Sequence, residues 1–109
     1  MNGIYVDRTP PVISEVQVVD MDATGYTVTC KVEDASSEIT KVQFPTWTVE
    51  GGQDDLAADW MNNPSCRGTQ NGTIWSYRVH DSAHNFERGI YRTHIYAWDS
   101  YGNSASASL

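Results

Sequence analysis

Carboxylates, an amide and imidazoles are the side chains in this sequence with the most chemistry to offer. Gln53, Asp54 and Asp55 follow a Gly-Gly pair, and His84 and His94 come later in the chain. Paired carboxylates beside imidazoles can ligate a metal ion or transfer protons. The sequence has no His-x-x-x-His or Cys-x-x-Cys spacing. We therefore interpret the group as a hydrogen-bonded network on a packed loop, in which an aspartate accepts from His94. A cleft holding both aspartates and a histidine would instead indicate an enzyme.

Two further patterns resemble known sites but lack their defining parts. The segment Asp20-x-Asp22-x-Thr24-Gly25 is similar to the start of a calcium loop, yet Lys31 stands where that loop needs a glutamate. A β-turn is the better interpretation. No nucleophile elbow or oxyanion-hole motif accompanies the triad-type side chains Asp81, Ser82 and His84. We expect no catalytic residue, no metal and no cofactor.

Aromatic side chains gather at outward positions in the strand register that we infer. They are Trp47, His94, Tyr96 and Trp98. Exposed rings can bind sugars, because the C–H faces of a pyranose stack on them, and a contiguous patch would mark a binding site. Alternatively, the long loop 49–72 folds over the rings and buries them beneath Leu56 and Trp60. We favour burial, because loops of this length are rarely left uncovered in a compact domain. The candidate ligand-binding residues are Trp47, Gln53, Asp54, Asp55, Trp60, His84, His94, Tyr96 and Trp98.

The elements that must position these residues read as strands. Apolar and polar residues alternate over residues 12–19, 26–32, 39–48, 73–80, 90–98 and 104–109, with turn-forming residues between them. Pro45 predicts a bulge or an edge inside the third run. A short helical turn over 54–60 would fit the long loop. The pattern predicts an all-β, immunoglobulin-like antiparallel β-sandwich of about seven strands. Its expected core is Val28, Cys30, Val32, Val42, Phe44, Trp75, Tyr77, Tyr91, Ile95 and Ala97.

Length and composition agree with one small domain. The 109 residues suit a single sandwich, which we place at residues 12–109 after a linker at 1–11 that ends in Pro10-Pro11. The formal net charge of −7 arises entirely in residues 1–55 and disfavours nucleic acid and anionic membranes as partners. The sequence has no run of about 18 apolar residues, so we do not expect insertion into a membrane. We interpret the chain as a monomeric domain of an exported protein whose signal lies elsewhere.

The two cysteines do not fit an antibody-type disulfide. Cys30 falls on the apolar face of the second strand, but the strand at 90–98 has no cysteine to pair with it. Cys66 lies in the long loop. We favour two unrelated thiols, with Cys30 buried, and keep a Cys30–Cys66 bridge as the alternative.

Several short motifs give the chain a family likeness between residues 39 and 103. They are Pro45-Thr46-Trp47, Gly52-Gln53-Asp54-Asp55-Leu56, Trp60, Gly72-Thr73-Ile74-Trp75, His84-Asn85, the run from Gly89 to Asp99 with its His94-x-Tyr96, and Gly102. With these motifs the chain resembles the group B streptococcal Bsp-like repeat, an immunoglobulin-like unit of Gram-positive surface proteins and cell-wall hydrolases. The family usually has Trp-Tyr soon after Gln-Asp-Asp, whereas here Trp60 comes late and Met61 follows it.

The resemblance implies a repeat beside a catalytic domain such as an amidase, peptidase or glycosidase. It implies no particular ligand, because a fold does not fix a function. We therefore expect a non-catalytic, secreted or wall-associated module that acts as a spacer or interaction domain, with neighbouring domains of the same polypeptide as partners. The alternative is a carbohydrate-binding module for peptidoglycan or host glycan.

Overall fold

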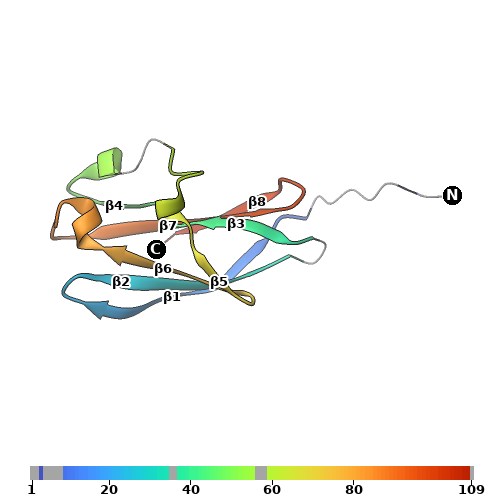
Figure 1. Ribbon diagram of the computed structural model, residues 1–109, viewed down its shortest axis with the longest axis horizontal. Coiled ribbons are helices and arrows are strands. Elements are labelled where there is room, and N and C mark those ends of the chain that lie inside the picture. Colours follow the sequence, from blue (N-terminus) through green and yellow to red (C-terminus); the bar gives the residue numbers. More distant parts are fainter. Residues whose placement is uncertain (1–2, 4–8, 35–36, 56–58, 109) are drawn as a thin grey trace.

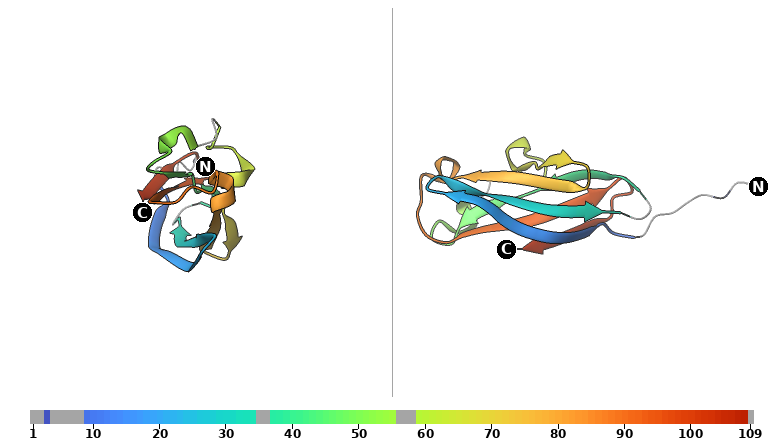
Figure 2. Two further views of the ribbon diagram at one scale, coloured as in Figure 1. Left: turned by 90° about the vertical axis from the view of Figure 1, so that its left-hand side faces the viewer. Right: turned by 90° about the horizontal axis from the view of Figure 1, so that it is seen from below.

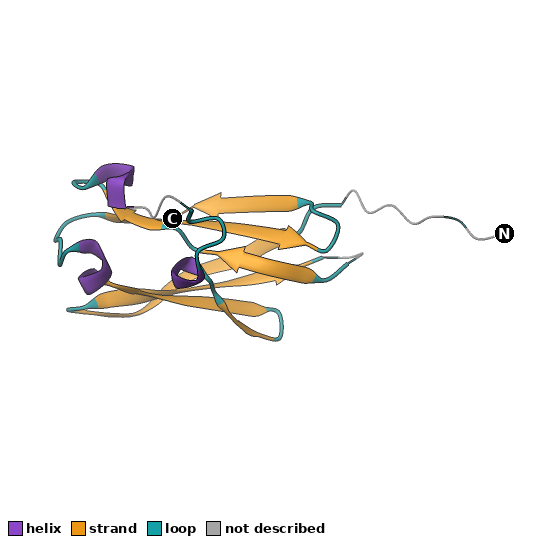
Figure 3. Ribbon diagram, turned by 45° about the horizontal axis from the view of Figure 1, so that its top comes forward, coloured by secondary structure: helices purple, strands orange, loops and turns teal. Residues whose placement is uncertain are grey.

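The structure, a computed structural model that describes residues 3, 9–34, 37–55 and 59–108, is built from strands and short 3-10 turns (Figures 1 and 3). No helix in this described part of the chain has the length and apolar character needed to cross a membrane. The elements are β1 (Val12–Asp22), β2 (Gly25–Glu33), β3 (Ile39–Gln43), β4 (Thr46–Thr48), η1 (Gly52–Asp55), η2 (Pro64–Cys66), β5 (Thr69–Asn71), β6 (Ile74–His80), η3 (Asp81–His84), β7 (Tyr91–Asp99) and β8 (Ser104–Ser108).

The strands form two antiparallel sheets that face each other (Figure 2). The first sheet has the order β1-β2-β6-β5, and in the second β7 pairs with β3 and β4 on one side and with β8 on the other. A four-stranded antiparallel sheet that packs on a second antiparallel sheet is the arrangement of an immunoglobulin-like sandwich. The predicted fold class is confirmed.

β3 and β4 are two parts of one strand interrupted at Pro45. Gln43 lies opposite Tyr96 and Thr46 lies opposite Thr93, so both parts keep the same register against β7. Proline has no N–H for a ladder, but its carbonyl accepts from the amide of His94 at 3.0 Å. With β3 and β4 counted together, the described sandwich has the seven strands expected from the sequence. The strand is interrupted at Phe44 and Pro45, but no bulge occurs there, and its register shift lies between Ile39 and Lys41.

The core follows the predicted inward faces. Eight of the ten expected residues form the buried cluster: Val28, Cys30, Val32, Val42, Phe44, Trp75, Ile95 and Ala97. Tyr77 is half-buried and packs against that cluster, whereas Tyr91 is half-buried and contacts Tyr26 and His84 instead. Val79, which shares the face of Trp75, is also buried. Tyrosines at the margin keep their hydroxyl groups near polar partners, which explains their incomplete burial.

The long connection 49–72 is more ordered than a loop. It contains η1, η2 and the short strand β5, which pairs with β6. The 3-10 turn η1 spans Gly52–Asp55, so it overlaps the helical turn predicted over 54–60 only at its first two residues, and residues 56–58 lie outside the described residues. Cys66 ends η2, and both its thiol and that of Cys30 are free and buried. Burial raises the pKa of both thiols, that of Cys30 to about 11.

The sandwich has two poles. The near pole carries the turns β2–β3, β5–β6 and β7–β8, and the leading segment joins β1 there (Figure 1). The far pole carries the β1–β2 hairpin and the connection 81–90 between β6 and β7. β1 and β8 both run from the near pole toward the far pole, one at the edge of each sheet (Figure 2).

Removing the Phe44 ring should reveal how much the core depends on it. Phe44 is fully buried and stacks on Tyr77 with ring centroids 5.5 Å apart. Gly68 sits so close that a Cβ there would lie 2.4 Å from the Phe44 ring. Phe44→Ala should lower the free energy of unfolding by about 3–5 kcal/mol in urea titrations. Phe86→Ala, a change at a ring that is 66% exposed, should alter it by less than about 0.5 kcal/mol. Similar losses for both variants would contradict the assigned core.

Candidate functional site

The outer face of the second sheet carries a continuous group of rings. β7 alternates, so Thr93, Ile95 and Ala97 are buried inward while the residues between them point outward. The rings that meet on the outer side are Trp47, Trp60, His94, Tyr96 and Trp98, which we call the aromatic face. The strand register inferred from the sequence predicted this outward position for four of them, all except Trp60.

Each ring of the aromatic face touches the next. Trp47 and His94 meet edge to face at 4.8 Å between ring centroids, and Tyr96 lies 6.3 Å from His94. Tyr96 and Trp98 stack at 6.2 Å. Residues two apart on one strand lie on the same face, so their rings form a row along β7. Trp47 is buried, whereas the three β7 rings are half-buried.

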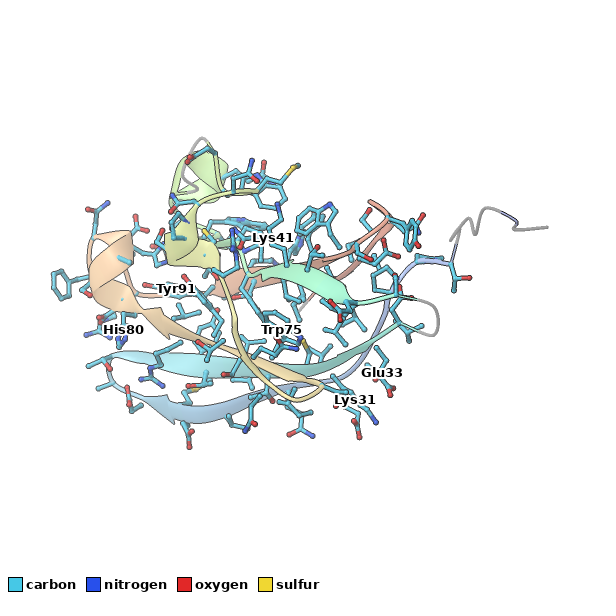
Figure 4. All side chains as sticks on the ribbon, turned by 45° about the vertical axis from the view of Figure 1, so that its right-hand side comes forward. Lys31, Glu33, Lys41, Trp75, His80 and Tyr91 are labelled. Atoms are coloured by element: carbon cyan, nitrogen blue, oxygen red, sulfur yellow. The ribbon has the colours of Figure 1, made fainter. Side chains whose placement is uncertain are left out.

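The segment 59–67 covers one flank of this row. The Trp60 ring lies 4.8 Å from Tyr96, as expected from the burial hypothesis. Lys41 reaches toward this segment, with its ammonium 3.0 Å from Asn62 Oδ1 and 4.3 Å from the centre of the Trp98 ring. Figure 4 shows Lys41 on the side of β3 turned away from Trp75 and the first sheet. The segment 59–67 therefore covers part of the aromatic face.

Gln43 is the anchor of the covering segment. Its side chain is fully buried although it lies on the outer side of β3. Its Nε2 donates to the carbonyl of Trp60 at 2.7 Å and to that of Asn63 at 3.0 Å, and its Oε1 accepts from Arg67 Nε. A fully buried amide with these three bonds fixes the loop, because Gln43 itself would otherwise be desolvated without partners.

The far end of the covering segment is tied by its backbone. The amide of Phe44 donates to Cys66 O at 2.7 Å, and that of Gly68 donates to Val42 O at 3.0 Å. Asn63 caps η2 by accepting from Ser65 N at 2.9 Å. Tyr77 Oη donates to Ser65 O at 2.8 Å. The chain thus crosses from the edge of the second sheet to β5 in the first.

The other flank of the row is formed by β8 and is lined by small hydroxyl groups. Ser104, Ser106 and Ser108 are exposed and lie opposite Trp98, Tyr96 and His94, respectively, while Ala105 and Ala107 turn inward. Serine side chains are too short to cover neighbouring rings. The aromatic face is therefore open toward β8 and closed toward the segment 59–67.

A model of the GBS Bsp-like repeat matches residues 15–108. That span includes both sheets and the whole aromatic face. The chain belongs to the GBS Bsp-like repeat family. Comparison with curated proteins and with solved structures gives no match. Membership of this family supports the interpretation of the chain as a repeat-type domain of bacterial surface proteins.

The sequence motifs on which the resemblance to the Bsp-like repeat rests do not meet at a single site in the structure. Gly52-Gln53-Asp54-Asp55 forms η1, where Gln53 is exposed and the side chains of the two aspartates lie outside the described residues, as does Leu56. The predicted bond from His94 to an aspartate therefore stays a prediction. His94 and Tyr96 belong to the aromatic face.

His84 lies away from His94. It is buried at the end of η3, where its ring meets Tyr91 edge to face at 5.4 Å. Tyr91 contacts Tyr26 of the first sheet, so His84 is on the inner side of β7 and His94 on the outer side. Asn85, which follows, has the left-handed φ of 54° that ends the turn. The structure thus separates the two histidines that the sequence grouped, and no His, Cys, Asp and Glu cluster in the described ranges could hold a metal.

The acidic groups with strongly lowered pKa cap turns. Asp22 accepts from the hydroxyl and the amide of Thr24 and from Arg78, which hold its pKa at about 2. Burial acts to raise the pKa of Asp99, but bonds from the Asn103 side chain and from nearby amides lower it to about 2. The calcium-like segment is thus the β1–β2 turn with Asp22 as its cap.

Sequence reasoning missed Gln43, Lys41 and the β8 serines as parts of this site. The alternating Ser-Ala pattern of β8 was the available signal for the open flank. Nothing in the local sequence around Gln43 shows that distant carbonyls converge on it. Its role depends on the path of the covering segment.

Replacing Gln43 should loosen the covering segment. Gln43→Ala removes the donor to the part-buried carbonyls of Trp60 and Asn63 and the acceptor of Arg67 Nε, so the free energy of unfolding should fall by about 1–3 kcal/mol. Trypsin should also cleave after Arg67 faster than in the parent protein, because local opening becomes easier. Gln17→Ala, at an exposed position of β1, serves as the matched control and should change neither. Unchanged stability together with unchanged cleavage would refute the anchoring role.

Proposed function

We propose that this Bsp-like repeat is a non-catalytic, extracellular module that serves as an in-line spacer and interaction unit of a larger bacterial surface or cell-wall protein. Its partners are the neighbouring domains of the same polypeptide, and the domain itself is a monomer. The direction of its terminal strands carries this proposal.

β1 starts at the near pole and β8 runs toward the far pole, so a polypeptide enters at one end and leaves toward the other (Figure 2). The long strands of both sheets run along one direction, which is the longest direction of the sandwich (Figure 1). A module of this kind lengthens a chain of domains along its own long axis. Pulling on it loads the β1–β2 and β7–β8 ladders along the strands, where many hydrogen bonds share the force.

The placement of the chemical groups supports a role without catalysis. His84 packs on a tyrosine ring inside the far pole, and Asp81 beside it pairs with Arg88 at 3.5 Å. The carboxylates of Asp22 and Asp99 are occupied by turn amides. These side chains stabilise the fold, which is the common use of polar groups in a small sandwich.

Joining two copies tests the spacer proposal. β1 alone has 11 residues, which at about 3.3 Å each give a sandwich length of about 36 Å. The maximum dimension from small-angle X-ray scattering should therefore grow by at least about that amount between one copy and two consecutive copies. A gain of about one sheet thickness, about 10 Å, would mean side-by-side packing and would overturn the in-line arrangement. Two variable-length linkers between the copies control for linker slack.

One observation favours a second function, carbohydrate binding. The aromatic face is open toward β8, where three serine hydroxyls stand beside three half-exposed rings. Rings that stack on sugar C–H faces and hydroxyls that bond to sugar edges are the two parts of a glycan platform. Binding to a wall polymer would raise the local concentration of a linked enzyme at that polymer and so increase its action there.

Trp98 provides the test of this second function. If the platform binds glycan, Trp98→Ala should weaken retention on insoluble peptidoglycan or on a glycan array about tenfold, equivalent to about 1.4 kcal/mol. Tyr101→Ala removes a ring that is 53% exposed in the β7–β8 turn and should leave retention unchanged. Absence of retention by the parent protein on both supports would remove this function and leave the spacer alone.

A further inference from the structure

The lysine and arginine side chains of the described residues fall into two groups. One group forms ion pairs with carboxylates, and its members are Lys31, Arg78 and Arg88. The other group pairs with no carboxylate in the described part of the chain, and its members are Lys41, Arg67 and Arg92. The sequence has 14 acidic side chains against 7 basic ones, so carboxylates are abundant. All three cations without a carboxylate belong to the side of the domain that carries the aromatic face.

Two of these cations stand at the ends of the row of rings on β7. Arg92 is exposed two residues before His94 and lies opposite Trp47 of β4. Lys41 lies opposite Trp98, with its ammonium 4.3 Å from the centre of that ring. Six strand residues separate positions 92 and 98, a distance of about 20 Å. Positive charge therefore brackets the row of rings.

These cations are bonded, where they are bonded at all, to neutral acceptors. Lys41 donates to Asn62 Oδ1 with one of the three N–H groups of its ammonium. Arg67 donates to Gln43 Oε1 through Nε alone, and Arg92 has no hydrogen-bond partner among the described residues. Each of the three side chains thus keeps N–H donors that an anionic ligand can use.

The outward strand positions between the cations carry no carboxylate in the described residues. β7 presents rings there, and β8 presents serine hydroxyls. Asp99 of β7 turns inward, where it is buried and bonded to Asn103. Asp59 lies in the covering segment, on the flank opposite β8. The open flank of the aromatic face is therefore neutral to positive in a domain whose formal net charge is −7.

Separate cations along a row of rings select a polymer whose negative charges are also separate. A densely charged phosphate polymer meets the repulsion of the net negative charge of the domain. A polysaccharide that contains uronic acid carries each carboxylate on a sugar ring, so a ring that stacks on the row brings its carboxylate to the edge of the row. Guanidinium groups bind planar carboxylates through two parallel hydrogen bonds. The combination of rings, hydroxyls and spaced cations matches this chemistry.

We propose that the aromatic face binds a polysaccharide that contains uronic acid residues. Its sugar rings stack on the row along β7, and its carboxylates bond to Arg92 and Lys41 at the two ends. The serines of β8 bond to its hydroxyl groups. This inference rests on the carbohydrate-binding function proposed above and names the class of glycan.

A matched pair of oligosaccharides tests the recognition of charge. The acidic probe has alternating glucuronate and N-acetylglucosamine units, and the neutral probe is its carboxyl-reduced form, in which each carboxylate is a primary alcohol. In isothermal titration the parent protein should bind the acidic probe about tenfold more tightly than the neutral probe, because hydrogen bonds to charged groups are the stronger ones. Polyphosphate, which has charge without sugar rings, should bind more weakly than the acidic probe.

Arg92→Gln identifies the cation that provides this preference. The Kd for the acidic probe should rise about tenfold, whereas the Kd for the neutral probe should stay at the parent value. Lys31→Gln makes the same change of net charge on β2, which belongs to the other sheet (Figure 4), and should leave both constants unchanged. Arg92 is exposed, so the melting temperature of Arg92→Gln should remain that of the parent protein.

The other outcomes would overturn the inference. Equal affinity for the two probes, tighter binding of polyphosphate, or the same loss in Lys31→Gln as in Arg92→Gln would exclude specific recognition of uronate. If the neutral probe still binds, carbohydrate binding itself stands. Binding of neither probe also overturns the inference, and retention on peptidoglycan or the glycan array with Trp98→Ala then decides separately whether the domain binds glycan at all.

Discussion

The strict alternation along β7 is the constraint on which both faces of the second sheet depend. Thr93, Ile95 and Ala97 have no exposed surface, and the outward residue that follows each of them, His94, Tyr96 and Trp98, carries a ring. β7 pairs on both sides, so a slip of one residue would move the rings into the core and the aliphatic side chains into water. The fixed register therefore specifies the core and the aromatic face together, and one cannot change without the other.

Period-two patterning was sufficient to predict the fold because most strands have one buried face. The inward residues of β2, β6 and β7 were identified for that reason, whereas the interruption between β3 and β4 was indicated by Pro45 itself. β5 escaped prediction because Thr69, Gln70 and Asn71 are all exposed, and its pairing with β6 comes from backbone groups alone. Tyr91 was placed in the core by its parity, but it lies near the far pole, where the sheets end and burial is incomplete.

The site was predictable only as a set of rings. Parity along β7 placed His94, Tyr96 and Trp98 on one side, and the length of the connection 49–72 favoured a cover. The grouping of His84 with His94 was wrong, because the residue types alone do not show on which side of the sheet the turn that carries His84 packs. The role of Gln43 depends on carbonyls 17 and 20 residues away, so it emerges from the tertiary path and not from any local pattern.

The two proposed roles use different parts of the domain. The aromatic face lies on the outer side of the second sheet beside β8, whereas the chain enters at the near pole and leaves toward the far pole. Neighbouring domains placed in line at the two poles would therefore leave the rings and the serines free. Where the spacer role holds successive domains in line, their aromatic faces keep a fixed spacing. An array with fixed spacing loses less conformational entropy when several faces bind one polymer, so the spacer role would strengthen glycan binding rather than replace it.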